Sequence, residues 1–131
     1  MDIYFETNYL QVKYDPKQQL VLQVWDGFVS KRAFEEGVDA ITECVIKNKA
    51  LNMVADTKNL TILPISYLEY SMSRLSEMEE SGLRVLFLVA PNNVFASSAV
   101  RKFKDREKKG GKARVEIVDT QHKALSWIKT I

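Results

Sequence analysis

The chain has 131 residues, of which 46% are hydrophobic and 27% charged, and its formal net charge is +2 at neutral pH. These values are typical of one globular domain over residues 1–131, which is long enough to bury a core without a metal or a disulfide. The single cysteine excludes an internal disulfide, and with one histidine there is no His/Cys cluster for zinc. So small a net charge gives no indication of nucleic-acid binding, and nothing in the composition calls for a cofactor.

The N-terminus lacks a basic region followed by a long apolar core, so we expect no signal peptide. No run approaches the roughly 20 apolar residues of a membrane helix, and we expect no transmembrane segment. With a single cysteine, a reducing, cytoplasmic location is the default expectation.

Two alternating segments, residues 9–15 and 20–26, are separated by a turn-forming Asp15-Pro16 pair. This pattern predicts a β-hairpin. The second segment is apolar on both faces, which favours a position further inside the sheet. Residues 1–8 show no clear period, and both a loose lead-in and a short edge strand remain open.

Residues 31–48 are predicted to form a helix capped by Ser30. Its apolar positions recur at helical spacing and form one stripe: Phe34, Val38, Ile41 and Val45. Gly37 lies beside that stripe, where it costs about 1 kcal/mol relative to alanine. We therefore expect the helix to approach the sheet closely at this residue.

The most apolar segment is residues 84–90, which ends at Pro91 and is predicted to be a strand buried on both faces. Residues 51–56 form the preceding strand, which should run parallel to the second hairpin strand. A final strand is predicted over 113–119 and a closing helix over 120–131. The apolar side of that helix is expected to consist of Ala124, Leu125, Trp127 and Ile128.

Between these strands lie two further helices. Ser66 and Glu69 match a capping box, with Ile65 and Tyr70 spaced as a hydrophobic staple, and Gly82 supplies the stop. The sheet-facing residues of this helix are expected to be Leu68, Met72 and Leu75. The next helix is predicted to begin at Asn93 and to bury three residues: Phe95, Ala99 and Phe103.

The resulting order, β-β-α-β-α-β-α-β-α, defines a single small α/β domain: an N-terminal β-hairpin leading into a mostly parallel sheet of about five strands with helices on its faces. Three landmarks carry a family resemblance: Trp25-Asp26-Gly27, Val54-Ala55-Asp56, and Asp119 through Trp127-Ile128. With them the chain resembles the STAS/SpoIIAA-like family, in particular its stand-alone bacterial STAS/SEC14-type domains. The resemblance implies a non-enzymatic regulatory or protein-interaction module with no catalytic residues.

In the sigma-regulating branch of that family, a partner kinase phosphorylates a serine at the start of the helix after the third strand. Ser66 lies at the matching place, although the residues around it, Leu63-Pro64-Ile65-Ser66-Tyr67, differ from the Asp-Ser-Ser-Gly-like motif of that branch. Helix capping accounts for Ser66 from its position alone and is the favoured interpretation. The family resemblance, by contrast, implies that Ser66 is a candidate phospho-acceptor.

The candidate partner-binding surface spans residues 57–74. Within it Tyr67, Tyr70 and Arg74 lie off the apolar stripe, and exposed aromatics beside arginine are typical of interface anchors. The alternative is that the tyrosines partly cover the sheet edge with their hydroxyls in water. We expect a protein partner here, and a homodimer is left open.

A strongly basic segment follows the central strand. The only acidic residues in this segment are Asp105 and Glu107. Its basic residues are Arg101, Lys102, Lys104, Arg106, Lys108, Lys109, Lys112 and Arg114. Such a segment is either a solvated face or an electrostatic patch for an acidic partner or anionic lipid.

Two other functions remain as alternatives. A small apolar ligand or lipid could lie between sheet and helices, in a cavity lined by Phe95, Phe103, Met72, Trp25 and Trp127. Less favoured is a Mg²⁺-dependent enzyme that uses the three aspartates at predicted strand ends: Asp26, Asp56 and Asp119. Each aspartate is explained as well by capping the next turn, so no metal site is predicted.

Overall fold

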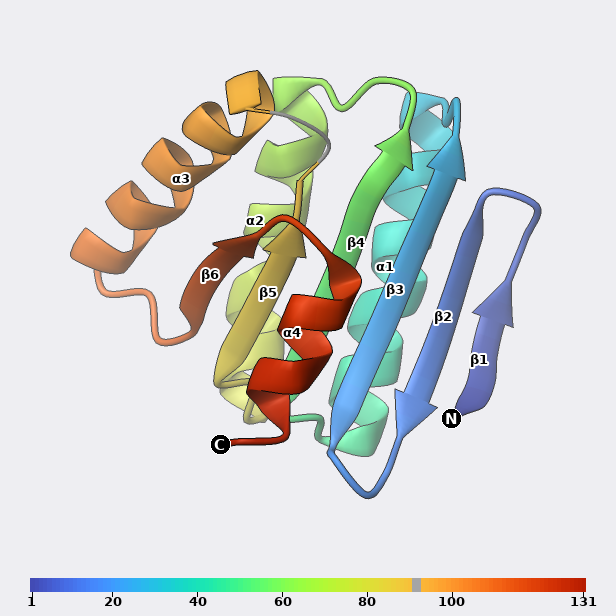
Figure 1. Ribbon diagram of the computed structural model, residues 1–131, viewed down its shortest axis with the longest axis vertical. Helices are drawn as coiled ribbons and strands as arrows, with labels where there is room; N and C mark the ends of the chain where they lie inside the picture. Colours follow the sequence, from blue (N-terminus) through green and yellow to red (C-terminus); the bar gives the residue numbers. More distant parts are fainter. Residues whose placement is uncertain (91–92) are drawn as a thin grey trace.

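The computed structural model describes residues 1–90 and 93–131, with the side chains of 93–100 left aside (Figure 1). Six strands form one sheet: β1 (Asp2–Glu6), β2 (Leu10–Asp15), β3 (Leu20–Gly27), β4 (Asn52–Leu60), β5 (Val85–Val89) and β6 (Arg114–Val118). The helices are α1 (Lys31–Asn48), α2 (Ile65–Ser81), α3 (Asn93–Lys108) and α4 (Gln121–Ile128). The expected cap at Asn93 and the burial of Phe95 and Ala99 lie outside the described side chains.

The strands lie side by side in sequence order, from β1 at one edge to β6 at the other. The pairs β1–β2 and β2–β3 are antiparallel, and every pair from β3 to β6 is parallel. The hairpin, the inner position of its second strand and the mostly parallel sheet are thus confirmed. Residues 2–6 form an edge strand, so the sheet has six strands; β1 is mostly exposed and lacks the apolar period that would have revealed it.

The sheet separates two apolar cores. The larger one lies under α1, α2 and α3 and includes Trp25, Phe34 and Phe103. The smaller one lies on the opposite face, where Ala124 and Ile128 of α4 pack on Phe87. Figure 1 shows α4 in front of the strands, with α1 and α2 behind them.

Strand β5 lies between β4 and β6 and is buried on both faces, as its apolar run predicts. Leu86 and Leu88 belong to the larger core, whereas Phe87 and Val89 belong to the smaller one. The two faces of β5 thus contribute to both apolar cores.

Helix α1 begins as predicted, because Ala33 N donates to Ser30 Oγ at 3.2 Å. The close approach expected at Gly37 is also confirmed. A methyl group added there would lie 2.5 Å from Cη2 of Trp25 and 2.8 Å from Cδ2 of Leu10. The glycine is therefore needed for the packing of α1 on β2 and β3.

The predicted start of α2 is wrong. Pro64 is the N-cap residue and no side chain caps the helix, so Ser66 and Glu69 form no capping box. With Pro64 as the N-cap, the positions of a hydrophobic staple are Leu63 and Leu68, so Ile65 and Tyr70 do not form the expected one. The backbone explains the different start. Pro64 already has the extended geometry of an N-cap residue, with φ −60° and ψ 150°. The helix therefore begins at Ile65, two residues before the start that a cap at Ser66 would give.

Strand β4 extends to Leu60, four residues beyond the prediction. After a register shift at Val24/Asp26 of β3, its polar end still pairs with β3 at Asn59 and Leu60. Thr57 is buried there and donates its hydroxyl to Val89 O at 2.8 Å. The polar composition of residues 57–59 concealed this part of the strand.

No helix in the described part of the chain is long and apolar enough to cross a membrane.

Candidate functional site

Three exposed apolar side chains mark the edge of the sheet where the parallel strands end. Phe28, in the loop between β3 and α1, is 68% exposed. Ile62 in the loop between β4 and α2 is 44% exposed, and Ile65 at the start of α2 is 39% exposed. Thr61 N donates to Gly27 O at 2.9 Å, which holds the two loops together. We call these three residues the Phe28 patch.

The loops that carry the Phe28 patch are held in place by buried residues. Val29 and Leu63, the neighbours of Phe28 and Ile62, are both buried. Tyr67 donates its hydroxyl to Val29 O at 2.8 Å and stacks on Phe34 with ring centroids 4.5 Å apart. Exposed apolar side chains on so firmly held a loop pair are typical of protein-docking surfaces.

The sequence interpretation did not select Phe28 or Ile62. The available signal was an isolated one: each is a large apolar residue in a loop, outside any periodic pattern. Such residues are common in sequences, and only the contact between the two loops shows that they lie together.

The predicted set of Tyr67, Tyr70 and Arg74 does not form one exposed surface. Tyr67 is only 7% exposed, so its expected position off the buried stripe is wrong. The reason is the hydrogen bond from its hydroxyl to the β3–α1 loop, which draws the first turn of α2 inward.

Tyr70 and Arg74 instead connect α2 to α1. Tyr70 donates its hydroxyl to Asp39 at 2.6 Å, and this hydrogen bond raises the pKa of Tyr70. Arg74 pairs with Asp39 and with Glu77, and the hydrogen bond to Glu77 raises its pKa further. Both side chains thus have intramolecular partners in the free protein.

Ser66 is exposed in the first turn of α2, next to Ile65. Because Pro64 is the N-cap residue, helix capping does not account for the Ser66 hydroxyl. The serine lies beside the Phe28 patch, where an added phosphate would meet the positive end of the helix.

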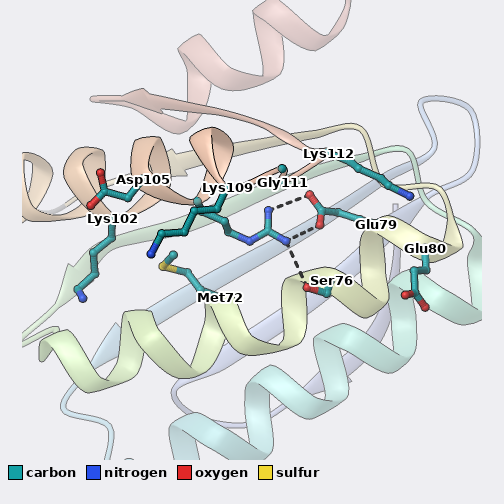
Figure 2. Close-up of a pocket in the computed structure, with 11 residues that line it drawn as sticks. Met72, Ser76, Glu79, Glu80, Lys102, Asp105, Lys109, Gly111 and Lys112 are labelled. Carbon is teal, nitrogen blue, oxygen red and sulfur yellow. Dashed lines mark hydrogen bonds and ion pairs between the residues drawn. The ribbon is translucent and has the colours of Figure 1, made fainter.

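The basic segment lines a groove of about 550 Å³ between α2 and α3 (Figure 2). Its charged lining consists of four basic and three acidic side chains: Lys102, Arg106, Lys109, Lys112, Glu79, Glu80 and Asp105. These charges nearly balance, so the groove is a weak attractor for an anion.

Arg106 is not an accessible docking residue. Its guanidinium pairs with Glu79, and the two side chains are 14% and 5% exposed. Its partner lies 27 residues earlier in the chain, which is why the charge run alone gave no sign of the pair. Burial by itself raises the pKa of Glu79, but hydrogen bonds from Arg106 and from Ala113 N outweigh it and lower that pKa.

Other members of the basic segment have acidic neighbours as well. Lys102 lies 3.7 Å from Glu69, and Lys104 lies 3.7 Å from Glu107. The predicted patch is thus reduced to its exposed members without an ion pair among the described residues: Arg101, Lys108, Lys109 and Lys112.

The three aspartates do not gather into one site. Asp56 is buried and accepts from Gln121 Nε2 at 2.9 Å, whereas Asp119 is exposed and pairs with Lys123. Asp26 is exposed on β3. Across residues 1–90 and the described part of 93–131, no three His, Cys, Asp or Glu side chains are placed to hold a metal ion.

The aromatic and methionine residues proposed for an apolar ligand do not share a cavity either. Trp25 and Phe103 belong to the larger core, whereas Trp127 packs on Phe87 on the opposite face, and Met72 lines the α2–α3 groove. The side chain of Phe95 lies outside the described residues. The cavity beneath the helices measures about 50 Å³, far below the roughly 300–1,000 Å³ of ligand pockets.

The fold places the chain in a known structural class. No protein-family model matches the chain, and no curated protein is significantly similar to it in sequence. Comparison with solved structures, however, shows that the chain has the SpoIIAA-like, or STAS, fold, as its sequence resemblance implied.

Two solved structures with this fold are similar along almost their whole length. The anti-sigma factor antagonist SpoIIAA in its unphosphorylated form superimposes with a TM-score of 0.69 over 93% of this chain and 99% of that one, at 16% sequence identity. A protein from the DUF3478 family of Shewanella loihica PV-4, with a SpoIIAA-like fold, gives a TM-score of 0.59 over 95% and 98%, at 10% identity.

Proposed function

We propose that this chain is a non-enzymatic regulatory module of the cytoplasm that binds a protein partner through the Phe28 patch. The single observation that carries the proposal is the patch itself, three exposed apolar side chains on two loops held together by a hydrogen bond and anchored on the core. The SpoIIAA-like fold supports a regulatory role by analogy, since SpoIIAA is an anti-sigma factor antagonist.

The proposed interface includes more than the patch. Tyr70 and Arg74 lie further along α2 and have to exchange their contacts with Asp39 if a partner uses them. The exposed cations of α3 and of the loop after it, Arg101, Lys108, Lys109 and Lys112, supply long-range attraction for an acidic partner protein. Anionic lipid remains a second candidate for the same cations.

Ser66 is the proposed regulatory residue at this interface. It is exposed and adjacent to Ile65, so a phosphate on it would bring about two negative charges into an apolar contact. Phosphorylation at Ser66 is therefore proposed to release the partner.

The experiment is a pull-down of native partners with the wild-type chain and four variants. We expect Phe28→Ser combined with Ile62→Ser to lower partner recovery about tenfold or more, because truncating central apolar anchors removes most of the binding energy. Ser66→Glu is expected to lower recovery as well, and Ser66→Ala to leave it unchanged.

Ile46→Ser is the matched control. Ile46 is 40% exposed, close to the value for Ile62, but it lies near the C-terminal end of α1 and outside the Phe28 patch. Equal loss of partner in Ile46→Ser, or full recovery with the Phe28/Ile62 variant, would show that the patch is not the interface.

A further inference from the structure

A second hollow lies at the other end of the sheet, where β4, β5 and β6 begin. It measures about 610 Å³ and opens between the β2–β3 turn and the end of α4. Phe87 and Trp127 form its aromatic part, with ring centroids 5.3 Å apart and ring planes inclined at 58°. In Figure 1 this is the lower end of the sheet, opposite the loops of the Phe28 patch. We call it the strand-start hollow.

All ionisable side chains that line the strand-start hollow are basic: Lys17, Arg84, Arg114 and Lys129. The α2–α3 groove, by contrast, has acidic and basic residues in nearly equal number. Arg114 is paired with Glu116, which lies outside the lining, so the three other cations create the potential that favours an anion.

Two of these cations are suited to different tasks. The guanidinium of Arg114 lies over the ring of Trp127, 5.3 Å from its centroid, and its Nε bonds Glu116, so its position is fixed. Arg84 is exposed and has no salt bridge within the described residues. Arg84 is therefore available to pair with an incoming carboxylate or phosphate.

The hollow also contains a buried acceptor without a donor. Gln18 lines it, and Gln18 Oε1 is buried with no hydrogen-bond partner in the described part of the protein. The amide orientation is determined by its other end, because Gln18 Nε2 donates to Asp15 at 3.0 Å, and the reverse orientation would set two oxygens against each other. A donor on a ligand would satisfy this acceptor once the half-buried Gln18 side chain turns toward the hollow.

We propose that the strand-start hollow binds a small organic anion that has a planar apolar body and one N–H or O–H donor. The planar body lies against the exposed part of Trp127, the anionic group pairs with Arg84 and Arg114, and the donor bonds Gln18 Oε1. The hollow is within the size range of small-molecule sites. This site is separate from the Phe28 patch, so it does not depend on the proposed function.

The test uses anilinonaphthalene sulfonate, a fluorescent probe with a planar ring system, a sulfonate and an N–H group. We expect saturable one-to-one binding to the full chain, weakened by added salt. The neutral analogue N-phenylnaphthylamine, which lacks only the sulfonate, should bind about tenfold more weakly because it forms no charge-assisted hydrogen bonds.

Three variants locate the binding site. Arg84→Gln should weaken binding of the sulfonate about fivefold or more, because it removes an ion-pairing partner while its exposed position leaves the fold intact. Arg32→Gln makes the same charge change on α1, which covers the other face, and should have no effect. Phe28→Ser should also have no effect, which separates this site from the Phe28 patch.

The proposal is overturned if no saturable binding occurs, if the neutral analogue binds as tightly as the sulfonate, or if Arg84→Gln binds like the wild type. Loss of binding in Phe28→Ser would assign the probe to the Phe28 patch and would equally overturn it. Amide shifts in a ¹⁵N spectrum give an independent readout: we expect them at residues 17–19, 84–87 and 127–129, and shifts confined to residues 28 and 62–65 contradict the proposal.

Discussion

Glu79→Ala is expected to lower the free energy of unfolding by about 3 kcal/mol, because it leaves the guanidinium of Arg106 largely buried without its partner. Ala113 N loses its acceptor at the same time. Thermal unfolding followed by circular dichroism should show a melting temperature lower by about 10 °C. Glu77→Ala on the same helix is the matched control, since its pair with Arg74 is solvent-exposed and is worth less than about 1 kcal/mol.

A double variant distinguishes the pair from the individual residues. Glu79→Leu with Arg106→Met should be less destabilising than the sum of the two single changes, because neither charge is then left unpaired. Additive losses would show that the two charges do not interact in solution.

The same pair predicts a pH dependence. The pKa of Glu79 is lower in the folded protein than its ordinary value of 4.5, so its contribution to stability is complete above that pH and is lost as the pH falls below it. Denaturant unfolding at neutral pH and near pH 3 should show a smaller loss of stability for Glu79→Gln than for the wild type. Equal losses would place the titration on other carboxylates.

Gly37→Ala is expected to destabilise the protein by about 2 kcal/mol, although alanine is the better helix former by about 1 kcal/mol. The added methyl would lie 2.5 Å from the indole of Trp25. That ring cannot easily move, because it stacks on Phe34 with centroids 4.6 Å apart and its Nε1 donates to Gln23 at 2.7 Å. Chemical denaturation measures the change.

Trp25→Phe provides the control for Gly37→Ala. It shortens the aromatic side chain at the point of contact, so the cost of the alanine should fall in the Trp25→Phe background, while the contact with Leu10 keeps part of it. An unchanged cost there would mean that α1 does not pack against Trp25 as described.

The sequence predicted the features in which one physical cause dominates. The uninterrupted apolar run of β5 is compatible with few positions other than a strand buried on both faces. Gly37, a poor helix former beside an apolar stripe, correctly indicated a close approach before the structure showed its partners. In both cases local pattern and tertiary packing favour the same outcome.

The predictions failed where a distant contact outweighs the local pattern. Residues 66–69 match the sequence pattern of a capping box, yet Pro64 is the N-cap residue and Tyr67 bonds to Val29. The helix therefore begins at Ile65. The basic segment suggested an exposed patch of unpaired cations, but Arg106 is ion-paired with Glu79 of α2. The Phe28 patch is made of two loops 34 residues apart in the sequence (Phe28 to Ile62), and no spacing rule links them.

The central claim is that a protein partner binds the Phe28 patch. Site-specific photo-crosslinking tests it most directly, with a photoreactive phenylalanine at position 62 and, as control, at the similarly exposed position 46. We expect one discrete crosslinked protein from position 62, competed away by unlabelled wild-type chain but not by the Phe28/Ile62 variant, and none from position 46. The same product from both positions, or none from position 62, would contradict the account.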